Sequence, residues 1–102
     1  MTADFTALGD GRYRVSGQLG FETVPEVWRK SRAVLNDGAA SVIDLGAVTQ
    51  VDSAALALVI EWMRWARTHD RQLEVVNIPE ALRALARISE VENLIESASP
   101  QS

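Results

Sequence analysis

The chain has 102 residues, of which 47% are hydrophobic, which is enough for one core but not for two. Its formal charge of −4 argues against a nucleic acid or an anionic membrane as partner, because both need a basic surface. The absence of cysteine excludes disulfides and thiolate metal sites. The N-terminus lacks the pattern of a signal peptide, and the longest apolar run, Ala54 to Ile60, is too short to cross a bilayer. We expect one cytoplasmic domain over residues 1–102, with a core over about 4–96 and a flexible tail over 97–102.

The first third of the chain predicts a β-hairpin followed by a helix. Two strand candidates flank Gly9-Asp10-Gly11, whose Asp-Gly step suits a tight turn; they cover residues 5–8 and 12–19. Residues 22–35 carry apolar side chains at helical spacing, with Thr23 as a candidate N-cap. Asn36-Asp37-Gly38 is a candidate stop for this helix.

The rest of the chain predicts alternating strands and helices. Residues 41–45 form a strand that is apolar on both faces, as expected at the centre of a sheet covered by helices. A short connector with Val48 and a helix over about 53–68 follow. The remaining expected elements are a strand at 73–78, a helix that Pro79 opens, a short helix with Val91, Leu94 and Ile95, and a frayed end.

The junction Val51-Asp52-Ser53 is the most informative part of the sequence, because it places an acid and a hydroxyl between a buried strand and an apolar helix. Asp and Ser are common N-caps, since their side-chain oxygens accept hydrogen bonds from unpaired first-turn amides. Capping alone would account for an arbitrary Asp-Ser pair. The functional interpretation depends on the neighbours Ala54 and Ala55, whose small side chains would let another surface approach the helix start closely.

The predicted helix over 53–68 is apolar on two sides. One arc forms the expected core face and consists of Leu56, Val59, Ile60, Met63 and Ala66. The opposite arc holds Ala54, Ala57, Leu58 and Trp65, with Glu61 between them. A neighbouring element of the same chain could cover Leu58 or Trp65. We favour the alternative, an exposed apolar stripe that begins at Ser53 and binds a partner, because Trp is a frequent interface anchor.

The segment VIDLGAVTQVDSAALALV, residues 42–59, resembles the signature of the STAS domain family. Residues 15–19 with Thr23, and residues 73–79, extend the resemblance to about 4–96. It implies the α/β STAS fold, a small mixed β-sheet with helices packed mainly on one face. The sequence departs from the family pattern at Ala55, where Gly is usual, and at Gly20, where an acid is often found.

The resemblance implies a protein-binding role and is strongest to MlaB-like members. These members are small cytoplasmic subunits that bind the ATPase subunit of Mla-type phospholipid ABC transporters and are peripheral to the inner membrane through that complex. The transporters maintain the lipid asymmetry of the outer membrane. The implied contact residues are Asp52, Ser53, Ala54, Ala57, Leu58, Glu61 and Trp65. The alternative is an anti-sigma factor antagonist that binds an anti-sigma kinase until Ser53 is phosphorylated. Neither role involves direct membrane insertion.

The residues give no support for an enzyme. His69 lies near the expected end of the helix over 53–68, where the helix dipole favours its charged form, and no nucleophile stands beside it. We interpret Asp44 as a structural acid at a strand end, and two carboxylates alone do not establish acid–base chemistry. Nucleotide-binding glycine motifs are absent from the sequence. We therefore expect no catalytic residue, metal or cofactor.

Overall fold

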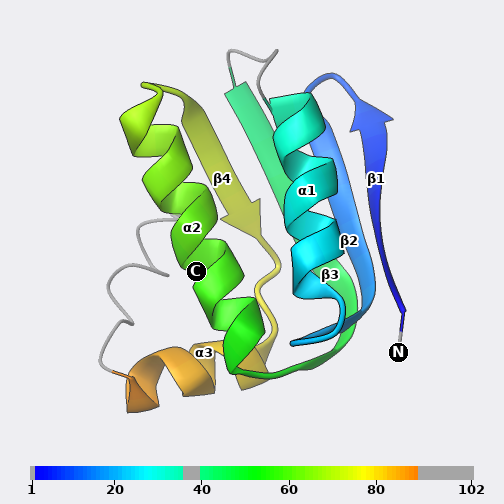
Figure 1. Cartoon of the computed structure of the whole chain (residues 1–102), viewed down its shortest axis with the longest axis vertical. Coiled ribbons are helices and arrows are strands. Elements are labelled where there is room, and N and C mark those ends of the chain that lie inside the picture. The colour runs from blue at the N-terminus through cyan, green and yellow to red at the C-terminus, as the bar shows by residue number, and fades with distance from the viewer. Residues whose placement is uncertain (1, 36–39, 90–102) are drawn as a thin grey trace.

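The computed structural model describes residues 2–35 and 40–89. Its elements in chain order are β1 (Ala3–Gly9), β2 (Arg12–Leu19), α1 (Val24–Leu35), β3 (Ala40–Val51), α2 (Ser53–Thr68), β4 (Gln72–Val76) and α3 (Glu80–Ile88). These strands form a four-stranded sheet in the order β1-β2-β3-β4. The β1–β2 pair is antiparallel, whereas β2, β3 and β4 run parallel. Helices α1 and α2 lie side by side on one face of the sheet (Figure 1), which confirms the expected fold class.

The opening hairpin follows from its turn residues. Asp10 and Gly11 both have positive φ angles, 54° and 75°, which a tight hairpin turn requires and which glycine adopts without strain. A Cβ atom at Gly11 would also lie 2.6 Å from the carbonyl oxygen of Ala40, so the turn packs closely against the start of β3. The predicted hairpin is therefore confirmed.

Strand β3 is longer than the sequence predicted. The expected connector around Val48 is wrong, because β2 continues to pair with β3 up to the contact of Leu19 with Val51. The pairing of β3 with β4, in contrast, ends at Asp44. The second half of β3 thus has a strand on one side only, and residues 46–50 are more exposed than the first half. Because exposed positions need few apolar side chains, this part of the sequence resembles a loop. Asp44 consequently lies inside a strand and not at its end.

The core lies between the sheet and the two helices, and a buried hydrogen bond joins the helices. Trp62 of α2 is fully buried, and its Nε1–H donates to the hydroxyl of Ser31 on α1 at 2.9 Å. The Ser31 hydroxyl in turn donates to the carbonyl oxygen of Trp28 at 2.8 Å. Each polar atom in this core contact therefore has a partner, as burial requires.

The expected exposed stripe on α2 is wrong for three of its residues. Leu58, Trp65 and Ala54 are only 2%, 6% and 9% exposed and belong to the buried hydrophobic residues. The reason is that α1 packs along one side of α2 and α3 contacts it elsewhere, so the buried arc is wider than the sheet alone would make it. The expected helix stop at 36–38, the short helix with Val91 and the tail over 97–102 lie outside the described residues.

Candidate partner-binding site

Asp52 joins two segments that are far apart in the sequence. Its Oδ1 accepts a hydrogen bond from the Ala54 N–H at 2.8 Å, which caps α2 as the sequence predicted. Its Oδ2 accepts a second bond, at 3.1 Å, from the backbone N–H of Phe21 in the loop between β2 and α1. One carboxylate therefore fixes the start of α2 against the segment that leads into α1.

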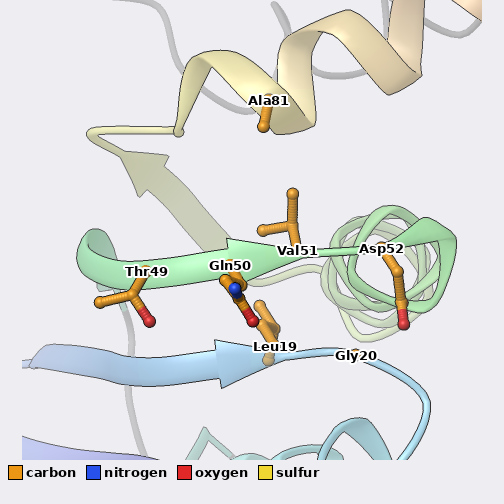
Figure 2. A pocket seen from close by; sticks show the side chains of 7 residues that line it. All are labelled: Leu19, Gly20, Thr49, Gln50, Val51, Asp52 and Ala81. Atoms are coloured by element: carbon orange, nitrogen blue, oxygen red, sulfur yellow. The ribbon is translucent and has the colours of Figure 1, made fainter.

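Gly20 makes room for this carboxylate. A Cβ atom at Gly20 would lie 2.5 Å from Asp52 Oδ2, closer than non-bonded atoms approach. Figure 2 shows Asp52 at the start of α2 beside the Gly20 loop. The position of the Asp52 carboxylate therefore favours glycine at residue 20, since any side chain there would disturb the hydrogen bonds of Asp52.

A hollow of about 370 Å³ lies at the carboxyl ends of β2 and β3 (Figure 2). It is lined by Leu19, Gly20, Thr49, Gln50, Val51, Asp52 and Ala81. This lining contains one carboxylate and no cationic side chain, so its charge does not suit a phosphate or another anion. Its uncharged polar groups, Thr49 and Gln50, are exposed and suit hydrogen bonds with a partner's surface.

Two side chains beside the Asp52 carboxylate face solvent. Ser53, the first residue of α2, is exposed, and its hydroxyl has no hydrogen-bond partner within residues 2–35 and 40–89. The Phe21 side chain is 70% exposed. A large exposed aromatic ring on a rigidly held loop is typical of an interface anchor.

A shallow apolar groove of about 190 Å³ continues from this end between α1 and α2. It is lined by Val24, Pro25, Trp28, Ala57, Leu58 and Glu61. Ala57 lies four residues after Ser53 and Glu61 lies four residues after Ala57, so these three positions follow one face of α2. Glu61 is half-exposed and forms an ion pair with Arg64 at 3.4 Å.

The structure brings together only part of the contact set that the sequence suggested. Asp52, Ser53, Ala57 and Glu61 are accessible around the start of α2 and the groove. Leu58 contributes to the floor of the groove despite its burial, whereas Trp65 packs against His69 with ring centroids 4.8 Å apart. Sequence reasoning missed Phe21 and Trp28 as site residues, because Phe21 is held beside the start of α2 by its bond to Asp52 and Trp28 faces the groove only where α1 packs on α2.

Asp44 is held in a separate polar cluster. Its Oδ1 accepts hydrogen bonds from the Gly46 N–H at 2.7 Å and from Asn77 Nδ2 at 3.0 Å. Burial raises the pKa of the Asp44 carboxyl, but these two hydrogen bonds and the charges of Arg14 and Arg12 outweigh it, so the pKa lies below its ordinary value. The structural role that we expected for Asp44 agrees with these contacts.

His69 occupies the end of α2, as the sequence predicted. It is the C-cap residue, and its Nδ1 lies 2.9 Å from the carbonyl oxygen of Trp65, to which it donates in the tautomer that carries the hydrogen on Nδ1. Among the residues that the structure describes, no three His, Cys, Asp or Glu side chains come together as a metal site would require. No helix in the same part of the chain is long and apolar enough to span a membrane.

Comparison with known proteins identifies the family. Residues 6–96 match the family model described as MlaB, STAS domain. No curated protein matches the sequence. Among solved structures, the chain is similar to the anti-sigma factor antagonist SpoIIAA in its unphosphorylated form, with a TM-score of 0.64 and 15% identity over 85% of this chain and 83% of that chain.

A second solved structure, of Mglu, is similar with a TM-score of 0.58 and 22% identity. It covers 76% of this chain but only 19% of that chain, so the likeness concerns one part of a much longer protein. At these identities both structural likenesses show the fold alone.

Proposed function

This chain belongs to the MlaB STAS domain family, and from that premise we propose that it is a non-catalytic subunit of a Mla-type phospholipid ABC transporter. In this proposal it binds the cytoplasmic ATPase subunit, supports assembly or activity of the complex, and is held near the inner membrane by that complex alone. Outer-membrane lipid asymmetry is the process served. STAS domains are protein-interaction modules, so the proposal needs a surface suited to a protein partner.

The observation that carries the proposal is the exposed surface around the start of α2. Phe21 offers an aromatic anchor, Ser53 a hydroxyl, and Ala57 a small side chain at the edge of the α1–α2 groove. The bonds of Asp52 to Phe21 and Ala54 hold this surface in place before a partner arrives. Little conformational entropy is then lost on binding, which favours a specific interface.

The groove specifies what the partner must present. Its lining is apolar apart from Glu61 at one end, which suits an aliphatic or aromatic side chain from the ATPase subunit. Glu61 and Arg64 lie beside it as an exposed pair and can exchange their mutual ion pair for contacts with the partner.

A second candidate is the role of an anti-sigma factor antagonist, and the exposed hydroxyl of Ser53 at the start of α2 favours it. Phosphorylation there would add about 1.5 to 2 negative charges, which the N-terminus of α2 would stabilise. The fold would survive this change, whereas the nearby Asp52 carboxylate and a closely packed partner would repel the new charge. For this candidate the partner is an anti-sigma kinase.

Affinity capture with the purified chain distinguishes the two candidates. We expect the tagged protein to retain an ABC ATPase from a native membrane extract, identified by mass spectrometry. Phe21→Ala serves as the loss-of-binding control. It removes the exposed aromatic anchor without touching the core, so the folded variant should retain less of the ATPase. Retention of a histidine-kinase-like ATPase in place of the transporter subunit would reject the first candidate and support the second.

Ser53→Glu tests the binding site itself. The added charge beside Asp52 should weaken binding of the captured ATPase by more than about tenfold, whereas Ser53→Ala should have a smaller effect because it removes one neutral hydrogen bond at most. Ser89→Glu provides the same substitution at an exposed serine after α3 and should leave the affinity unchanged. Calorimetry measures the affinities, and unchanged binding by a folded Ser53→Glu protein would remove this site from the mechanism.

A further inference from the structure

Strand β1 forms an open edge of the sheet, away from the partner-binding site on α2. It pairs with β2 on one side, and within the part of the chain that the structure describes no strand pairs with its other side. Figure 1 shows β1 at the sheet edge next to α1, with α2 over the opposite half of the sheet. Leu8 near the end of β1 is 45% exposed. Such an edge is a template for another extended chain.

The backbone groups that face outward can be assigned from the hairpin. The Gln18 N–H donates to the carbonyl oxygen of Thr2 at 2.9 Å, so the backbone of Thr2 points towards β2. Alternate residues of an antiparallel strand point the same way, and the register is regular from Ala3 to Ala7. The backbone N–H and C=O groups of Ala3, Phe5 and Ala7 therefore point away from the sheet.

A groove runs beside these outward-facing groups. It has a volume of about 360 Å³ and is lined by Phe5, Ala7, Arg29, Lys30, Ala33 and Val34. Two of the three residues with outward-facing backbone groups, Phe5 and Ala7, thus also line the groove. A strand added to β1 would place every second side chain in this groove, against α1.

The charge of the groove selects the occupant. Arg29 is paired with Glu26 through bonds of 2.7 and 2.8 Å, whereas Lys30 has no acidic partner among the described residues. An acidic side chain opposite Lys30 would supply that partner, while Ala33 and Val34 suit an apolar neighbour. Pairing two copies of this chain through β1 would instead bring two basic grooves together, which disfavours self-association.

We propose that the outer edge of β1 is a strand-addition site for an extended peptide segment of another protein, which directs both acidic and apolar side chains into the groove beside α1. Main-chain hydrogen bonds to Phe5 and Ala7 give affinity, and the groove gives specificity. The site is separate from the surface around Ser53, so both can be occupied at once. The proposal does not depend on which partner binds α2.

The probe is an end-blocked synthetic peptide in which threonine alternates with valine and glutamate. We expect it to bind the full chain, measured by fluorescence anisotropy, and to shift the backbone amide resonances of Ala3, Phe5 and Ala7. The same peptide with lysine in place of glutamate should bind at least about tenfold more weakly. Failure of the glutamate peptide to bind at about 1 mM would overturn the proposal.

Two variants separate the contributions of backbone and charge. Ala7→Pro removes an outward N–H without breaking a β1–β2 hydrogen bond, which edge strands tolerate, and should weaken peptide binding about tenfold. Lys30→Glu should abolish the preference for the glutamate peptide, whereas Arg67→Glu on α2 makes the same charge change elsewhere and should preserve it.

Thermal midpoints check that these variants remain folded. Unchanged peptide affinity of a folded Ala7→Pro protein would contradict strand addition. Concentration-dependent dimerisation that Ala7→Pro abolishes would also contradict the proposal, because it would assign the edge to a second copy of the chain.

Discussion

Asp44 and Asp52 make the same local hydrogen bond in two regions with different roles. Each accepts a bond from the backbone N–H two residues ahead, Gly46 at 2.7 Å and Ala54 at 2.8 Å. Each also accepts a bond from a distant segment, Asn77 in one case and Phe21 in the other. Yet Asp44 lies inside β3, whereas Asp52 follows the last residue of β3 and caps a helix.

The difference shows that a hydrogen bond from the backbone N–H two residues ahead to an Asp carboxylate does not by itself determine the conformation of the residues that follow. After Asp44, β2 continues to offer a partner strand, so the chain remains extended as far as Val51. After Asp52 this pairing has ended at Leu19, and the free first-turn amides can form a helix. Tertiary pairing therefore determines whether such an acid stabilises a strand or a helix start.

Removing the two carboxylates should give unequal losses of stability. We expect Asp52→Ala to lower the free energy of unfolding by about 2 kcal/mol, because it removes a helix cap whose bond to the Ala54 N–H is partly buried, together with the bond to the Phe21 N–H. Asp44→Ala should cost about 1 kcal/mol, since water can reach the groups that it leaves. Urea unfolding of both variants measures the difference, and equal losses would mean that the two acids have equivalent roles.

Substitution of Gly20 should act only through Asp52. Gly20→Ala places a Cβ only 2.5 Å from Asp52 Oδ2, and we expect a loss of about 1–2 kcal/mol as the carboxylate gives up its bond to Phe21. In the Asp52→Ala background the same substitution should cost little. A double-mutant cycle measures this coupling, and additive losses would show that the new methyl group disturbs something other than Asp52.

The smallest expected effect concerns pH. Because the pKa of Asp44 is lower in the folded state than in the unfolded chain, its stabilisation is complete above the unfolded value of about 4 and is lost as the pH falls through the folded value. Asp44→Asn should remove this contribution, which solvent screening keeps below about 1 kcal/mol. Unfolding curves recorded between neutral and acidic pH test the expectation; an identical acid slope in both proteins would contradict it.

Local sequence signals predicted the elements that depend on local contacts. Asp10-Gly11 identified the hairpin, and Asp52 identified the start of α2. The second half of β3 could not be predicted in this way, because its strand conformation depends on pairing with β2. The burial of Leu58 and Trp65 was also missed, since an apolar side chain on the outer arc of a helix is covered or exposed according to where the neighbouring helix lies.

The same limit applies to the candidate site. The residues on one face of α2, such as Ser53 and Ala57, follow from helical spacing and were found from the sequence. Phe21 was not, because its place beside the helix start is created by a bond to a carboxylate 31 residues away. Contacts between distant segments thus determine which exposed side chains share one surface.

The buried bond from Trp62 to Ser31 sets the alignment of α1 and α2 along their common direction. If one helix slid by a turn, the indole N–H would lose its acceptor in the interior, at a cost of about 1–3 kcal/mol. Apolar contacts alone would resist such sliding far less, since they are not directional. The shape of the apolar groove between α1 and α2, with Trp28 on one wall and Ala57 on the other, therefore depends on the buried hydrogen bond from Trp62 to Ser31 between the same two helices.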